Sequence, residues 1–273
     1  MTTTQTTELP LRRTGFVDHD GESLYYEVIG EGQVPLVLSH GAGGNHASWF
    51  QQVAAFAPER QVVVWDHRGY GRSSDRADRS GPEVAPGDLL AVCDHLGIAR
   101  ADLAGQSMGG WTVVGAALAR PSLARSLVLT DTPGGFSLPS LPTRRGGARR
   151  GVLAAGDRVG VHPAVDASFS LSHPALAYLY QAIGRMGSAD PDVIIPRMGL
   201  VTHDAAEAAR LTMPVLCIVG DRDPLVSPVV VHELAALLPR ATVVEIAGCG
   251  HSPYFEDADA WNGAVRAFLA ALP

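Results

Sequence analysis

The 273-residue sequence contains no lysine, so arginine supplies all 21 of its basic side chains. We attribute this to compositional bias, because no local chemistry would exclude lysine everywhere. Cysteine is also rare: Cys93, Cys217 and Cys249 form no close-spaced pair, which argues against a disulfide framework. With 28 acidic residues the net charge is −7, and this balance argues against nucleic acid as the main partner.

Long hydrophobic runs are also absent. No apolar segment reaches the ~18 residues that a membrane-spanning helix needs, and residues 1–8 lack the pattern of a signal peptide. We therefore expect a cytoplasmic protein that acts on a small molecule, without a membrane partner. Histidine, aspartate and glutamate show no paired metal-ligand spacing, so neither a metal nor a cofactor is expected.

Short apolar segments alternate with helical patterns along the chain, and 46% of the residues are hydrophobic. This alternation predicts an α/β protein whose parallel sheet is covered by helices on both faces. The predicted strands are residues 16–20, 23–29, 36–39, 62–65, 101–104, 126–130, 215–219 and 242–246. The predicted helices are residues 48–56, 89–96, 110–120, 174–186, 228–238 and 258–272.

Residues 136–208 interrupt this alternation. They begin with closely spaced proline and glycine and continue with helical stretches such as residues 174–186, without a clear buried strand. We interpret them as a helical cap inserted above the carboxyl edge of the sheet, where it would wall the substrate cavity. The core would then consist of residues 1–135 and 209–273.

The most informative motif is Gly105-Gln106-Ser107-Met108-Gly109, which reads G-x-S-x-G between a strand pattern and a helix pattern. A serine on such a tight strand-to-helix turn is exposed at the carboxyl edge of the sheet. Small flanking residues allow the strained turn. Ser107 is therefore the candidate nucleophile, and a serine hydroxyl needs a base to remove its proton.

His251 is the candidate base, because it lies in a glycine-containing loop directly after the last predicted strand. A catalytic histidine needs a carboxylate that fixes its tautomer and stabilises the imidazolium. Asp223, in the loop after the seventh predicted strand, fits this role best by its spacing and chain order. Asp221 and Asp131 are the alternatives.

An oxyanion intermediate needs two preorganised donors. One is expected to be the backbone N–H of Met108, and the other that of Ala42 in the glycine-rich loop 39–44, with Gly43 as the next choice. This loop has neither a Walker ending nor G-x-G-x-x-G spacing, which argues against a nucleotide site. We expect His40 to hold the loop in place rather than act as a second base. The candidate substrate-pocket residues, whose aromatic members could equally be core residues, are His40, Gly41, Gly43, Trp49, Gln106, Trp111, Phe136 and Tyr254.

Five motifs in this order resemble the α/β-hydrolase superfamily from about residue 14 to the C-terminus. They lie at residues 40–44, 66–73, 105–110, 220–223 and 250–253. The resemblance implies an eight-stranded, mostly parallel sheet with a lid and a Ser107–Asp223–His251 triad. The chain is most similar to the small bacterial branch that includes enol-lactonases, carboxylesterases and meta-cleavage-product hydrolases.

The resemblance implies a serine hydrolase that cleaves a small-molecule ester or lactone without a cofactor. Carbon–carbon hydrolases of the meta-cleavage-product type also use serine, but they often carry Asn before the nucleophile and Trp after the catalytic histidine. This chain has Gln106 and Ser252 at those positions. A non-catalytic homologue that binds a small ligand is a third alternative, and the complete set of triad motifs argues against it.

Overall fold

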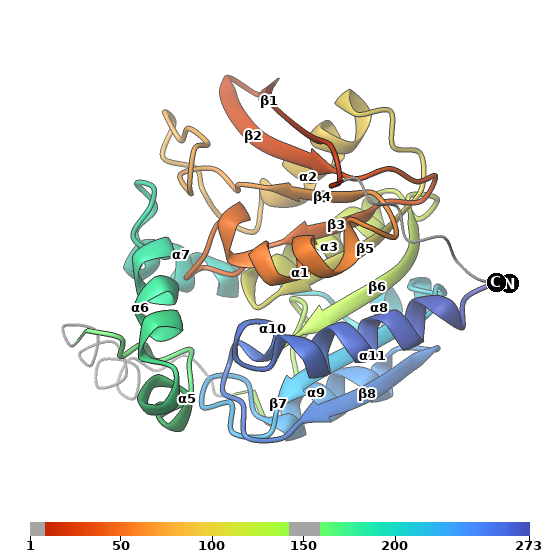
Figure 1. The fold of residues 1–273 in the computed structure, drawn as a ribbon. Helices are drawn as coiled ribbons and strands as arrows, with labels where there is room; N and C mark the ends of the chain where they lie inside the picture. Colours follow the sequence, from red (N-terminus) through yellow and green to blue (C-terminus); the bar gives the residue numbers. More distant parts are fainter. Residues whose placement is uncertain (1–8, 142–158) are drawn as a thin grey trace, which may run out of the picture.

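The computed structural model describes residues 9–141 and 159–273. The strands are β1 (Arg12–His19), β2 (Glu22–Ile29), β3 (Leu36–Ser39), β4 (Val62–Trp65), β5 (Ala101–Gln106), β6 (Ala124–Thr130), β7 (Val215–Gly220) and β8 (Ala241–Ile246). They form one eight-stranded sheet in the order β1-β2-β4-β3-β5-β6-β7-β8 (Figure 1). β2 is antiparallel to both β1 and β4, and every other neighbouring pair is parallel. The predicted α/β class with a mostly parallel sheet is confirmed.

Helices cover both faces of this sheet. They are η1 (His46–Trp49), α1 (Phe50–Phe56), α2 (Ala85–His95), α3 (Met108–Ala119), α5 (Ala167–Ser172), α6 (Pro174–Ile183), α7 (Pro191–Arg197), η3 (Met198–Leu200), α8 (Ala205–Arg210), α9 (Pro228–Leu237), α10 (Pro253–Glu256) and α11 (Ala258–Ala270). Buried side chains of α1 and α11 form one core with the sheet, and those of α2, α3 and α9 form a second core on the opposite face (Figure 1). Within the described part of the chain, no helix is both long and apolar enough to cross a bilayer.

The central strands are buried along their whole length because both of their faces are covered. All four residues of β3 and all four of β4 are buried. In β3 the side chain of Val37 packs in one core, and those of Leu36 and Leu38 pack in the other. Parallel strands covered on both faces therefore appear in the sequence as continuous apolar runs rather than as alternating patterns.

The edge of the sheet differs more from the sequence-based expectation. β1 starts at Arg12, four residues before the predicted start at residue 16. The prediction missed this part of the strand because its first three residues are exposed and give no hydrophobic signal. The predicted turn between β1 and β2 is formed by Asp20 and Gly21, with φ of 53° and 80°. Two successive positive φ values are typical of the type I′ turn, whose twist suits a two-residue hairpin.

The segment predicted as a cap lies in part outside the described residues, which omit 142–158. Its described helices α5, α6 and α7 lie together beyond one end of the strands, away from the C-terminus (Figure 1). Residue 208 falls within α8. Both Ala208 and Phe136 are packed into the core that α2, α3 and α9 form with the sheet. The two ends of the segment therefore pack as parts of the core.

The start of α3 approaches the end of β3 so closely that only glycine fits between them. A Cβ atom on Gly109 would lie 2.1 Å from the carbonyl oxygen of Ser39 and 2.9 Å from that of His40. Both are backbone atoms, which cannot move aside as a flexible side chain would. Gly109 thus fixes the distance between α3 and the loop that follows β3.

We expect Gly109→Ala to lower the free energy of unfolding by roughly 1–3 kcal/mol, the usual range for overpacking. Gly263→Ala is the matched control, because a Cβ there meets no atom within 4 Å. Since Gly263 lies inside α11, the control should raise stability by up to about 1 kcal/mol. Urea unfolding measures both changes, and equal effects of the two substitutions would contradict the close approach.

Candidate active site

Ser107 occupies a strained turn between β5 and α3, with φ 50° and ψ −115°. Positive φ is rare for residues other than glycine and persists only where the surroundings enforce it. Its backbone N–H donates to the carbonyl oxygen of Thr130 at 2.9 Å. Its own carbonyl oxygen accepts from the N–H of Gly110 at 2.9 Å and from Oγ1 of Thr132 at 2.8 Å. These bonds fix the turn and leave the Ser107 side chain partly exposed.

His251 and Asp223 lie together at the same carboxyl edge. Nδ1 of His251 is 2.7 Å from Oδ2 of Asp223, and both residues are buried. Oδ1 of Asp223 accepts from the N–H groups of Leu225 at 2.7 Å and Val226 at 3.0 Å, which hold the carboxylate in place. Because a carboxylate accepts, Nδ1 carries the proton and Nε2 is left as the acceptor. Asp221 instead accepts from the N–H of Gly248.

Asp131, the other alternative for the acid, is buried at the end of β6 beside this pair. Asp131, Asp223 and His251 each offer an atom within 4.8 Å of the others. Oδ1 of Asp131 accepts from the N–H of Gly220 at 3.0 Å, whereas its Oδ2 has no partner. Burial, reinforced by the charge of Asp223, raises the pKa of Asp131 well above its usual value. The raised pKa favours the protonated form of Asp131 over the charged form that a histidine-orienting carboxylate needs.

These three residues are also the one group in the described ranges, 9–141 and 159–273, whose spacing could hold a metal ion. Nδ1 of His251 and Oδ2 of Asp223 are already hydrogen-bonded to each other. The raised pKa of Asp131 opposes the loss of a proton, and a metal-binding carboxylate must give up its proton. The donor set therefore suits proton transfer better than metal binding.

The loop that carries His251 is anchored on both sides. The Glu256 carboxylate accepts from the N–H of Gly250 at 3.0 Å and from that of Ser252 at 3.2 Å. The side-chain amide of Gln106, the residue before Ser107, donates to the His251 carbonyl oxygen at 2.8 Å. Gln106 thus brings the serine turn and the histidine loop into direct contact. The hydrogen bonds of Ser107 involve its backbone alone, so a Ser107–His251 hydrogen bond stays a prediction.

His40 fixes the loop that holds the predicted oxyanion donor Ala42. Its Nδ1 donates to the Gly41 carbonyl oxygen at 2.8 Å, and its Nε2 accepts from the backbone N–H of His67 at 3.1 Å. Burial lowers the pKa of His40 to about 4, so the ring is neutral at pH 7. Both ring nitrogens are engaged. A Cβ on Gly41 would lie 2.0 Å from Oε1 of Gln106, so a side chain there would displace the Gln106 amide.

An apolar cluster joins the predicted oxyanion donors to the cap. Met108 and Trp111 of α3 pack with Ile194 of α7 and Met198 of η3, and Ala42 lies against the same group. Ile194 and Met198 were missed by the sequence analysis. The sequence around these two residues has no regular hydrophobic period that would separate residues lining a pocket from residues packing in a core.

Three aromatic pocket candidates belong to the core, and we correct their assignment accordingly. Trp49 and Tyr254 pack ring to ring with centroids 4.4 Å apart, and neither is more than 1% exposed. Phe136 is packed beside His203 in the other core. A large apolar residue near a motif can face the pocket or the core, and the sequence alone does not distinguish these two directions.

His162 and Tyr180, two cap residues that the sequence analysis also missed, lie beside Gly43. A Cβ on Gly43 would be 3.4 Å from Cε1 of His162 and 3.7 Å from the hydroxyl oxygen of Tyr180. The Tyr180 hydroxyl is in turn 2.8 Å from Oγ of Ser252. The segment predicted as a cap therefore contacts both the glycine-rich loop after β3 and the loop that carries His251.

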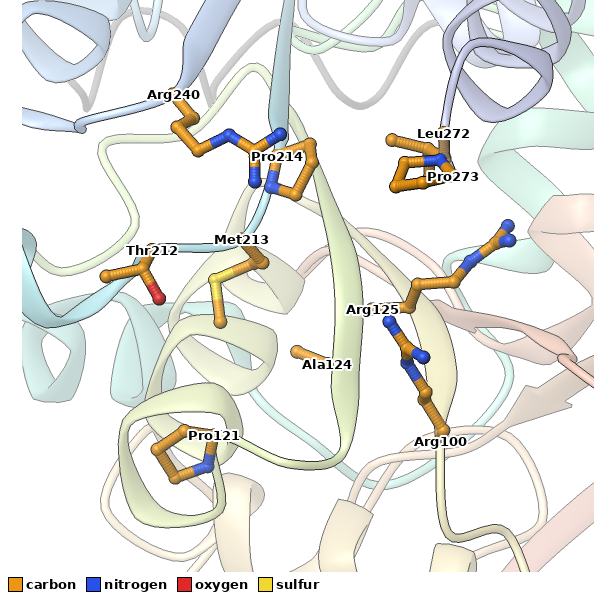
Figure 2. Close-up of a pocket in the computed structure, with 10 residues that line it drawn as sticks. All are labelled: Arg100, Pro121, Ala124, Arg125, Thr212, Met213, Pro214, Arg240, Leu272 and Pro273. Atoms are coloured by element: carbon orange, nitrogen blue, oxygen red, sulfur yellow. The ribbon is translucent and has the colours of Figure 1, made fainter.

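A separate hollow of about 200 Å³ opens at the opposite edge of the sheet. Figure 2 shows the side chains of Arg100, Arg125 and Arg240 around it, near the starts of β5, β6 and β8. Its lining includes none of the predicted site residues. The chemistry-bearing side chains gather instead at the carboxyl edge, where open parallel sheets bind their ligands.

Comparisons with known proteins agree with this geometry. Residues 34–258 match the family model described as alpha/beta hydrolase fold. The enol-lactonase from Burkholderia xenovorans LB400 superposes with a TM-score of 0.79 at 28% identity, covering 94% of this chain and all of that one.

Two curated relatives match most of the chain. RutD of Pseudomonas syringae pv. syringae (strain B728a), provisionally named a carbamate hydrolase, is 31% identical over 256 residues, covering 87% of this chain and 94% of that protein. The dihydrolipoyllysine-residue acetyltransferase component of the Pseudomonas putida acetoin cleaving system is 29% identical over 255 residues. That match covers 90% of this chain but 66% of the acetyltransferase, so the chain spans less than two thirds of that relative.

Substitutions at the two neighbouring aspartates test which carboxylate orients His251. We expect Asp223→Asn to reduce kcat for p-nitrophenyl acetate by about 10³–10⁴-fold, because an amide at this position favours the wrong histidine tautomer. Asp131→Asn keeps the size of the side chain and should keep kcat within about tenfold of the wild type, because the raised pKa of Asp131 opposes the charge that an orienting carboxylate needs. Circular dichroism checks that both variants fold. A larger loss in Asp131→Asn than in Asp223→Asn would transfer the role to Asp131.

Proposed function

The chain belongs to the alpha/beta hydrolase fold family, and we propose that it hydrolyses a small-molecule ester or lactone through an acyl-enzyme on Ser107. The observation that carries this proposal is the 2.7 Å hydrogen bond between His251 and Asp223, at the edge of the sheet where Ser107 occupies its strained turn. The likeness to an enol-lactonase over nearly the whole chain supports a carboxylic ester bond as the target.

In the first half of the reaction, Oγ of Ser107 attacks the substrate carbonyl carbon while Nε2 of His251 takes the hydroxyl proton. Asp223 stabilises the imidazolium that forms. The oxyanion is bound by the N–H groups of Met108 and Ala42. Met108 is the first residue of α3, where backbone N–H groups lack partners within the helix and the helix dipole favours negative charge.

In the second half, His251 gives its proton to the leaving alkoxide and the carbon–oxygen bond breaks. Water then attacks the acyl-enzyme while His251 removes its proton, and the same proton returns to Oγ of Ser107 as the acid leaves. With a lactone the alkoxide and the acid belong to one molecule, so the product is a single hydroxy acid. No step requires a cofactor.

The position before the nucleophile and the position after the base argue against the carbon–carbon alternative. The amide of Gln106 is engaged by the His251 carbonyl oxygen, and the hydroxyl of Ser252 is engaged by Tyr180. Neither side chain is presented to a substrate in place of the Asn and Trp that meta-cleavage-product hydrolases often carry. A carbamate would pass through the same acyl-enzyme chemistry, so it belongs in the substrate panel.

Ser107→Ala tests the nucleophile. We expect its turnover of p-nitrophenyl acetate to fall by at least about 10³-fold with normal folding, because only binding and the oxyanion donors remain. A fluorophosphonate probe should label the wild type and fail to label this variant. Turnover near the wild-type rate in Ser107→Ala would discard the assignment, and a folded wild type that resists the probe would favour a non-catalytic binding role.

A panel of esters, lactones, carbamates and vinylogous diketones tests the bond that is cleaved. We expect the wild type to hydrolyse esters or lactones, and the Ser107→Ala variant to lose these same activities. The variant serves as the control for turnover that does not depend on the nucleophile. Turnover of diketones without turnover of any ester or lactone would establish carbon–carbon cleavage instead.

A further inference from the structure

His162 places an imidazole edge against the loop that carries the predicted oxyanion donor. If Gly43 had a Cβ, it would lie 3.4 Å from Cε1 of His162 and 3.7 Å from Nε2. The ring packs edge-on against Tyr180, with centroids 4.9 Å apart. The His162 side chain is only partly buried. The predicted donor Ala42 precedes Gly43 directly.

The protonation state of His162 follows from its main-chain contact. Its Nδ1 accepts the backbone N–H of Ala164 at 3.1 Å, and a ring nitrogen that accepts cannot carry a proton. The proton of the neutral ring is therefore on Nε2, the nitrogen on the side of Gly43. Burial, reinforced by His251 and Arg185, lowers the pKa of His162 to about 4, so the ring stays neutral at pH 7.

His162 cannot serve as a second base, because its accepting nitrogen is occupied and the other nitrogen already holds a proton. His162 offers a fixed N–H donor at Nε2. Among the described residues, no hydrogen bond supplies an acceptor for this donor. The neighbouring Tyr180 hydroxyl is already paired with Ser252. A sheltered donor next to an apolar ligand group would lose its hydrogen bond to water without gaining another, which costs about 1–3 kcal/mol.

We propose that the Nε2–H group of His162 binds a second oxygen of the substrate, beside the scissile ester or lactone group, and selects substrates that carry this oxygen. The oxygen is an ether, hydroxyl or carbonyl acceptor in the acyl part or in the alcohol part. This inference rests on the proposed hydrolytic function and deepens it. Sites built to hydrogen-bond a substrate group discriminate strongly against analogues that lack it.

Two substrate pairs that exchange one methylene for one oxygen test the proposal. p-Nitrophenyl methoxyacetate and p-nitrophenyl butyrate differ in the acyl part, and 2-methoxyethyl acetate and butyl acetate differ in the alcohol part. Intrinsic reactivity cancels when the ratio of kcat/KM within a pair is compared between variant and wild type. The two pairs also show on which side of the scissile bond the oxygen lies.

Three variants separate the donor from the shape of the ring. His162→Phe keeps a ring and removes the donor, and His162→Asn is polar but too short to place a donor at Nε2. We expect both to lower the oxygen-to-methylene ratio of one pair by roughly tenfold. His162→Gln, whose amide nitrogen reaches the position of Nε2, should keep the ratio within about threefold of the wild type.

Unchanged ratios in both pairs would overturn the inference. An equal loss for both members of each pair would also overturn it, because that result indicates packing or an oxyanion contact common to all substrates. Fluorophosphonate labelling of each variant reports separately on Ser107. If every variant is labelled and the ratios do not change, only the role of His162 fails, whereas an unlabelled wild type would remove the proposed function itself.

Discussion

The candidate site depends on the contact between the start of α3 and the end of β3. Gly109 lies where any Cβ would collide with the Ser39 carbonyl oxygen, and Gly105 lies where one would come within 2.3 Å of the Gly109 carbonyl oxygen. This approach of backbone to backbone forces Ser107 into its positive-φ turn. It also sets the N–H of Met108 beside the loop that contains Ala42. The strained turn of Ser107 and the positions of the proposed oxyanion donors thus have the same steric cause.

Burial then simplifies the electrostatics around the proposed triad. It raises the pKa of Asp131 and lowers the pKa values of His40, His67 and His162, so each of these four shifts favours the neutral form of its group. The Asp223 carboxylate is therefore the charge that acts on the His251 imidazole at close range. Charges interact more strongly where water is excluded, so this arrangement favours the imidazolium that proton transfer from a serine would create.

The sequence predicted the sheet and the residues at the ends of its strands because both produce local patterns. Ser107 and Asp223 follow the buried strands β5 and β7, His251 follows the edge strand β8, and parallel strands bring their carboxyl ends to one edge. The cap contacts had no such signal. Ile194 lies on the short helix α7 and His162 in a segment without helix or strand, and no hydrophobic period or turn motif in the sequence reveals their positions. The sequence analysis also left core and pocket aromatic residues indistinguishable, because proximity to a motif does not fix the direction of a side chain.

One carboxylate joins the segment predicted as the cap to the loop that carries the predicted base. Asp166 donates its N–H to Glu256, the same carboxylate that holds Gly250 and Ser252 on either side of His251. Burial raises the pKa of Glu256, so this carboxylate relies on the three N–H groups for its charged form. Because His162 lies in the same segment as Asp166, the proposed substrate contact and the loop of His251 are joined through this one carboxylate.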